Sequence, residues 1–221
     1  MFSFVLLVHV LAGFAALGLF WIPVVTKKGG RWHRLSGWSY TWAMGTVAVT
    51  AVILALLRIF VEPGLTPDRF SFSVFLLFIS VLAGATAYYG IRTLRIARTR
   101  ERVVRWYDLG VSFLLLLSGV AAVAFGAALK DPLITYFPIL GIVLGSTQLW
   151  FWWRPAERWN EWVAEHLRGM LGCSIATITA FAVFGGPRLL GLEGGNLLLW
   201  FAPTLLLGPL IALYARRWSQ A

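Results

Sequence analysis

The sequence predicts an all-α membrane protein, a polytopic bundle of seven transmembrane helices with its amino terminus outside and its carboxy terminus in the cytoplasm. The composition is the first reason: hydrophobic residues make up 59% of the 221-residue chain and charged residues only 13%. A soluble domain carries about 25% charged residues, so this chain has too few to cover a water-facing surface. The second reason is the 12 tryptophans, many of them near segment ends, as in an interfacial aromatic belt.

Apolar segments, each near the 20 or so residues that a transmembrane helix needs, fill the chain. We therefore expect a single transmembrane domain over residues 1–221 and no soluble domain. Asp108 and Ser36 are expected as N-cap residues and Pro132 in a first helical turn. The predicted spans are Phe2–Val25, Gly37–Val61, Arg69–Ile91, Asp108–Leu129, Pro132–Trp153, His166–Phe184 and Asn196–Tyr214.

Lysine and arginine orient these spans, because connections rich in them stay in the cytoplasm. One side of the predicted membrane holds 15 such residues: Lys27, Lys28, Arg31, Arg34, Arg92, Arg95, Arg98, Arg100, Arg102, Arg105, Arg154, Arg158, Arg168, Arg216 and Arg217. The other side holds four, namely Arg58, Arg69, Lys130 and Arg188. The net charge of +10 thus lies in short loops beside anionic lipid. This pattern predicts membrane lipids rather than nucleic acid as partners, and a bacterial cytoplasmic (inner) membrane as the location.

The residue types that the predicted spans lack exclude or disfavour several classes of function. The only lysines are Lys27, Lys28 and Lys130, so the seventh span cannot form a retinal Schiff base. The nine acidic residues fall outside the middle of the predicted spans, which disfavours an ion-coupled carrier but leaves a facilitator open. The single cysteine, Cys173, excludes an internal disulfide and a cysteine-based metal cluster.

The three histidines are the candidate site residues. His33 and His166 lie at the cytoplasmic ends of the second and sixth spans, and His9 is about 24 Å of helix from that level. Two imidazoles from facing helices can hold a haem iron, so the pair is a candidate for a single haem b or a divalent metal. Arg34 and Arg168 would then lie near anionic groups such as haem propionates.

Each histidine also has a simpler interpretation. His9 is expected to face another helix and to bond a backbone carbonyl or a polar side chain. His33 and His166 are equally well explained as interfacial residues beside Trp32 and Trp162. The stripe Trp159, Trp162, His166, Met170, Cys173 and Thr177 could line a cofactor cleft or form the buried side of a helix.

Carboxylates at the same level add a third alternative, a site of two histidines and one carboxylate. Asp108, Glu161 and Glu165 could supply that ligand. Asp108 is more simply a helix cap, and the two glutamates could instead pair with Arg158 and Arg168 at helical spacing. The arginines from Arg92 to Arg105 are interpreted as a cytoplasmic connection lying on anionic lipid.

The stretch His33-Arg34-Leu35-Ser36-Gly37-Trp38-Ser39-Tyr40, followed by Met44, resembles a signature of bacterial predicted membrane proteins in the domain-of-unknown-function family numbered 2306. Members similarly carry a histidine in the first helix, here His9, and a Lys-Gly step before the His-Arg pair, here Lys28-Gly29. The segment from His166 to Phe181 is similar to late-helix motifs of related proteins. Many members begin a middle helix with His-Arg-x-Trp-Met, where this chain has Arg105-Trp106-Tyr107-Asp108 and no histidine.

The resemblance covers the first two spans well and the sixth moderately. The family has no established activity, so the resemblance implies the membrane topology and highlights Gly37 and Tyr40 beside His9, His33, Arg34 and His166. Tyr40 thereby joins the candidate cofactor-binding residues.

Three classes of function stay open. The first is a redox protein that binds one haem b through His33 and His166 or acts with a quinone. The second is a membrane metal-dependent hydrolase that uses the same histidines and a carboxylate. The third is a non-enzymatic lipid-binding, transport or assembly protein. The sequence also leaves open a homo-oligomer or a second membrane protein as partner.

Overall fold

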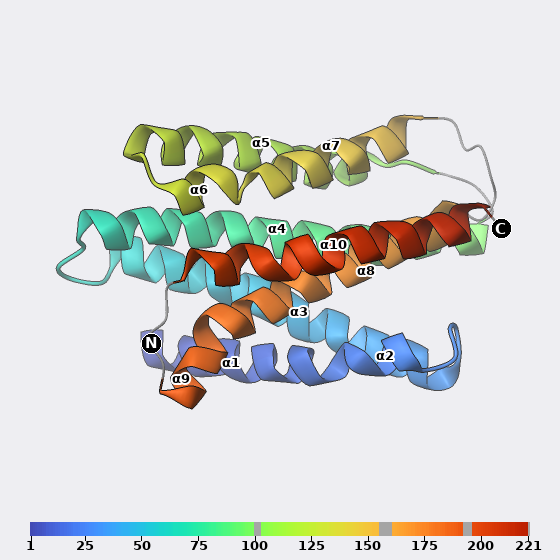
Figure 1. The fold of residues 1–221 in the computed structure, drawn as a ribbon, viewed down its shortest axis with the longest axis horizontal. Helices are drawn as coiled ribbons and strands as arrows, with labels where there is room; N and C mark the ends of the chain where they lie inside the picture. Colours follow the sequence, from blue (N-terminus) through green and yellow to red (C-terminus); the bar gives the residue numbers. More distant parts are fainter. Residues whose placement is uncertain (100–102, 155–160, 192–195, 221) are drawn as a thin grey trace. The chain divides into compact units, whose positions relative to one another are not determined.

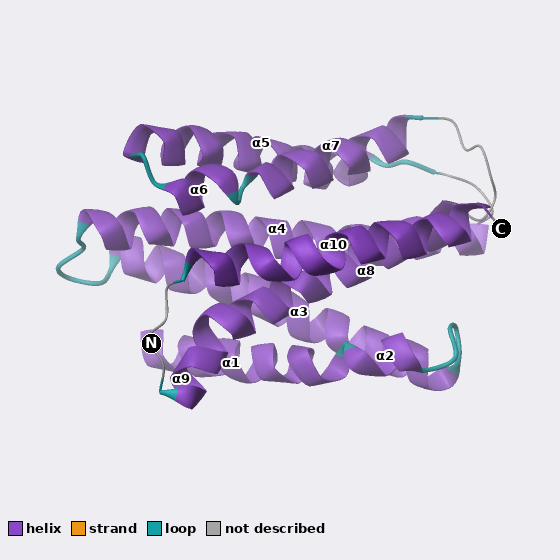
Figure 2. Cartoon of the chain, viewed as in Figure 1, coloured by secondary structure: helices purple, strands orange, loops and turns teal. Residues whose placement is uncertain are grey.

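A computed structural model describes residues 1–99, 103–154, 161–191 and 196–220, and every regular element in these ranges is a helix (Figures 1 and 2). The elements are α1 (Phe2–Leu19), α2 (Trp21–Val25), α3 (Arg31–Phe60), α4 (Pro67–Thr99), α5 (Trp106–Leu129), α6 (Pro132–Tyr136), α7 (Ile139–Trp153), α8 (Glu161–Ala180), the π-helix η1 (Phe181–Gly185), α9 (Gly186–Leu190) and α10 (Leu197–Gln220).

Seven helical stretches within the described residues are long and apolar enough to cross a membrane, which confirms the predicted number of spans. They are Phe2–Val25, Arg31–Phe60, Pro67–Ile96, Trp106–Leu129, Pro132–Trp153, Glu161–Leu190 and Leu197–Arg216. Four helices extend well beyond the predicted spans at the ends that were expected in the cytoplasm: α3 begins at Arg31 and not Gly37, α4 continues past Ile91, α8 begins before His166, and α10 continues past Tyr214 to Gln220. A hydropathy pattern identifies only the apolar part of each of these helices.

The helix starts correct two predictions. Ser36 lies inside α3, where its hydroxyl donates to the Trp32 carbonyl at 2.6 Å, so it is not an N-cap. The N-cap of α5 is Arg105, and Asp108 stands three residues later, with its carboxylate accepting the Arg105 backbone N–H at 2.8 Å. Pro132 begins α6 as predicted, directly after the N-cap Asp131.

The chain forms two compact units, Met1–Gly84 and Ala85–Ala221, with the boundary inside α4. In the first unit α1 and α2 pack along α3. In the second unit α5 packs against α6 and α7, and α8 packs along α10, as Figure 1 shows.

Small residues lie where helices of the second unit approach closely, because they let two backbones come near each other. A Cβ added to Gly145 would lie 2.7 Å from the Leu116 backbone nitrogen of α5. One added to Gly169 would lie 2.5 Å from the Cα of Gly90 in α4. The approach of α8 to α4 therefore depends on glycine in both helices.

Gly169→Ala is expected to destabilise the protein by about 1–3 kcal/mol, because its methyl group would meet backbone that cannot turn aside. Gly172→Ala is the matched control on the same helix, since a Cβ there meets only Thr86 Cγ2 at an ordinary 3.5 Å. The midpoint of thermal unfolding in detergent should fall for the first variant and stay near wild type for the second. Equal midpoints would contradict the close approach.

Candidate functional site

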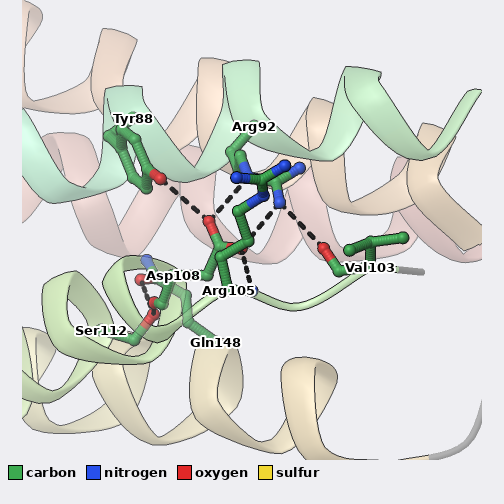
Figure 3. Close-up of polar contacts among 7 residues, drawn as sticks. All are labelled: Tyr88, Arg92, Val103, Arg105, Asp108, Ser112 and Gln148. Atoms are coloured by element: carbon green, nitrogen blue, oxygen red, sulfur yellow. Dashed lines mark hydrogen bonds and ion pairs between the residues drawn. The ribbon is translucent and has the colours of Figure 1, made fainter. Parts of the chain in front are cut away.

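A buried carboxylate organises one end of the second unit (Figure 3). Asp108 is fully buried, and its two oxygens accept four hydrogen bonds. Oδ1 accepts from Tyr88 Oη at 2.9 Å and from Arg92 Nε at 2.7 Å. Oδ2 accepts from Arg92 Nη2 at 2.8 Å and from the Arg105 backbone N–H at 2.8 Å. All lone-pair positions of this carboxylate are thus engaged by the chain itself.

Arg92 completes this arrangement. Its side chain is only 7% exposed, and Nη2 also donates to the Val103 carbonyl at 2.9 Å. Tyr88 and Arg92 are four residues apart on α4, so both reach Asp108 from one face of that helix. The prediction that Arg92 lies on anionic lipid is wrong, because α4 continues through this position and pairs the guanidinium with Asp108.

Adjacent residues of α4 contact α8. Tyr89 donates to Glu165 Oε2 at 2.6 Å, and His166 Nδ1 lies 2.8 Å from the Gly90 carbonyl oxygen. Because a carbonyl only accepts, Nδ1 carries the proton in this contact. Arg168 pairs with Glu165 as the sequence predicted. Glu161 pairs with Arg154 at 3.1 Å, and its predicted partner Arg158 lies outside the described residues.

An aromatic cluster lies beside these polar contacts. We define it by its buried members Tyr89, Ile96, Phe151 and Trp152 and by the partly buried Val104, Leu109 and Trp162 that pack on them. The ring of Tyr89 meets Phe151 and Trp152 edge to face, with centroids 5.9 and 5.5 Å apart. Such geometry is the favoured one for aromatic pairs. Helices α4, α7 and α8 each contribute a ring to this cluster.

Two polar groups of the aromatic cluster have no hydrogen-bond partner among the described residues. These are the indole nitrogens of Trp152 and Trp162, both shielded from solvent. Among the described residues the Thr179 hydroxyl is the other buried side-chain atom of this kind. A buried donor left without an acceptor costs roughly 1–3 kcal/mol, so two in one cluster are a considerable cost for the folded state. Such groups call for an explanation by a water, ion or ligand.

The first unit contains His9, His33, Arg34 and Tyr40. His9 Nδ1 lies 2.9 Å from Thr50 Oγ1 on α3, which confirms the prediction that His9 bonds a neighbouring helix. The Thr50 hydroxyl donates to the Thr46 carbonyl at 2.6 Å, so His9 is the donor in this contact.

His33 is the third residue of α3, and its Nδ1 lies 3.1 Å from the Pro23 carbonyl. Arg34 is exposed, and Tyr40 is only 1% exposed and packs edge-on against Phe20. The histidines therefore belong to different units, His33 to the first and His166 to the second. Their pairing around one haem or metal stays a prediction.

The expected carboxylate ligands are engaged in other contacts. Asp108 and Glu165 bond tyrosine and arginine side chains, and Glu161 pairs with Arg154. Within the described parts of the chain, no group of three or more histidine, cysteine or acidic residues is placed to hold a metal ion.

Comparison with models of protein families, with curated proteins and with solved structures finds no match for this chain. The resemblance to the bacterial membrane-protein family stays a prediction. The candidate site therefore rests on the residues of this chain alone.

Sequence reasoning missed Tyr89, Arg92 and Trp152 as site residues. The charge pattern assigns Arg92 to a cytoplasmic connection. The position of Trp152 near the end of a predicted span groups it with the interfacial tryptophans. The one available signal was the spacing of Tyr88 and Arg92, which places two polar side chains on one face of an apolar helix. Nothing in the sequence distinguishes the buried Trp152 from its exposed neighbours Trp150 and Trp153.

Arg92→Ala should lower the free energy of unfolding by about 3–5 kcal/mol, because it leaves the Asp108 carboxylate buried without its cation. Arg58→Ala is the control: it removes an ion pair whose arginine side chain is 32% exposed, and it should cost about 0–1 kcal/mol. Unfolding of both variants in mixed micelles with increasing denaturing detergent gives the comparison. An Arg92 variant as stable as the Arg58 variant would show that Asp108 does not need its partner.

Proposed function

We propose that this protein lies in a bacterial cytoplasmic membrane with its amino terminus outside and its carboxy terminus in the cytoplasm. The support is the uneven distribution of lysine and arginine, 15 residues on one predicted side and four on the other. The buried pairing of Arg92 removes one charge from the larger group and leaves the imbalance strong.

Labelling of single cysteines tests this orientation. In a Cys173→Ala background, Ser3→Cys should react with a membrane-impermeant maleimide in intact spheroplasts, because it would lie at the outer surface. Ser219→Cys should react only after the membrane is broken. Labelling of Ser219→Cys in sealed spheroplasts, with Ser3→Cys protected, would reverse the proposed orientation.

We further propose that the protein binds a membrane-phase ligand at the aromatic cluster. Of the two histidines expected to hold a cofactor, only His166 belongs to the same unit as this cluster, and it follows Trp162 by four residues on α8. The observation that carries this proposal is the pair of buried indole N–H donors of Trp152 and Trp162, for which the described part of the chain offers no acceptor. The nearby carboxylates are already bonded to Tyr88, Tyr89, Arg92 and Arg154, so they do not relieve this cost. An acceptor brought by a ligand would do so.

The ligand should copurify with the protein from membranes in mild detergent. Organic extraction with mass spectrometry, together with an absorption spectrum that would register haem, identifies it. In the double variant Trp152→Phe/Trp162→Phe the retained ligand should fall more than about tenfold, because phenylalanine keeps an aromatic ring but donates no hydrogen bond.

The control is Trp150→Phe/Trp153→Phe, which changes two tryptophans of α7 whose side chains are 67% and 65% exposed. It should retain the ligand at the wild-type level. A wild-type protein without copurified ligand, or equal retention in both double variants, would contradict the proposal.

A further inference from the structure

Each of three arginines near the aromatic cluster forms an ion pair with a carboxylate. Arg92 lies over the Trp152 ring, 5.8 Å from its centroid, and is paired with Asp108. Arg154 lies 6.0 Å from the centroid of Phe151 and is paired with Glu161. Glu165, which accepts the Tyr89 hydroxyl, is paired with Arg168. Within the described ranges, the three arginines and three carboxylates that contact the cluster or its polar neighbours already neutralise one another.

This balance disfavours an ionic ligand. An anion buried here would have to take an arginine from its carboxylate, and a carboxylate left alone in a buried site is strongly destabilising. A buried cation would have to take a carboxylate from its arginine, and it would leave that arginine without a partner. A neutral ligand leaves all three ion pairs intact.

The two indole N–H groups without partners determine which hydrogen-bonding atoms the ligand must present. Both are N–H donors, and an indole nitrogen cannot accept a hydrogen bond. The ligand must therefore present acceptor atoms, for which carbonyl oxygens are suitable. The other members of the cluster are the rings of Tyr89 and Phe151 and the aliphatic side chains of Ile96, Val104 and Leu109, which favour a flat apolar ligand.

We infer that the aromatic cluster binds a neutral quinone ring, whose carbonyl oxygens accept hydrogen bonds from Trp152 Nε1 and Trp162 Nε1. This inference rests on the proposed ligand site and specifies its chemistry. Because neither nitrogen is reached by solvent, the ring enters as the side chains of the cluster part.

Isothermal titration in detergent micelles tests this inference with three probes: decylubiquinone, hemin and inorganic phosphate. Decylubiquinone should bind the wild-type protein, and Trp152→Phe and Trp162→Phe should each weaken binding about tenfold, as expected for one lost hydrogen bond in a water-excluded site. Trp150→Phe/Trp153→Phe should change the dissociation constant less than twofold. Size-exclusion profiles establish that each variant is folded, and Trp162→Phe, at a partly buried position, serves if Trp152→Phe fails this criterion.

The outcomes separate this inference from the proposal on which it rests. Binding of hemin or phosphate that is lost in Trp152→Phe/Trp162→Phe, without decylubiquinone binding, would overturn the quinone assignment and leave the ligand site standing. Decylubiquinone binding that is equal in all variants would show that the two indoles are not its donors. No binding of any probe, and no copurified ligand, would overturn both.

Discussion

The second unit depends on one electrostatic constraint, the satisfaction of the Asp108 carboxylate in a fully buried position. A buried carboxylate is tolerated only when it is paired and hydrogen-bonded, and here four donors meet this requirement. Arg92 supplies two of them and is thereby held over the Trp152 ring. The first turn of α5 thus fixes a side chain of α4, which in turn contacts the aromatic cluster.

Helix α4 joins α5 and α8 through neighbouring residues. Tyr88 and Tyr89 are adjacent, so their side chains leave the helix about 100° apart, and each reaches a carboxylate of a different helix. Gly90 then lets α8 approach until Gly169 lies against its backbone. These contacts hold Tyr89, Trp152 and Trp162 together at the cluster but leave the two indole donors without acceptors. The proposed ligand supplies these two hydrogen-bond acceptors.

Much of the fold could be predicted because membrane spans are determined by local composition. The seven apolar segments, the small residues at Gly145 and Gly169, and the contact of His9 with a neighbouring helix all follow from residue type and spacing. The site could not be predicted in this way. The burial of Arg92 depends on Asp108, a residue of the next helix, and the difference between Trp152 and Trp150 depends on which side of α7 packs inward. Both are tertiary properties that hydropathy does not record.

The central claim is that the Trp152 and Trp162 indoles donate hydrogen bonds to a bound ligand, and nuclear magnetic resonance of the indole N–H groups in ¹⁵N-tryptophan-labelled protein measures this directly. Addition of decylubiquinone should shift the proton resonances of these two indoles downfield, as a new hydrogen bond requires, and should leave those of the exposed Trp150 and Trp153 in place. Resonances of Trp152 and Trp162 that stay unchanged with saturating quinone, or that shift equally with those of the exposed indoles, would contradict the account.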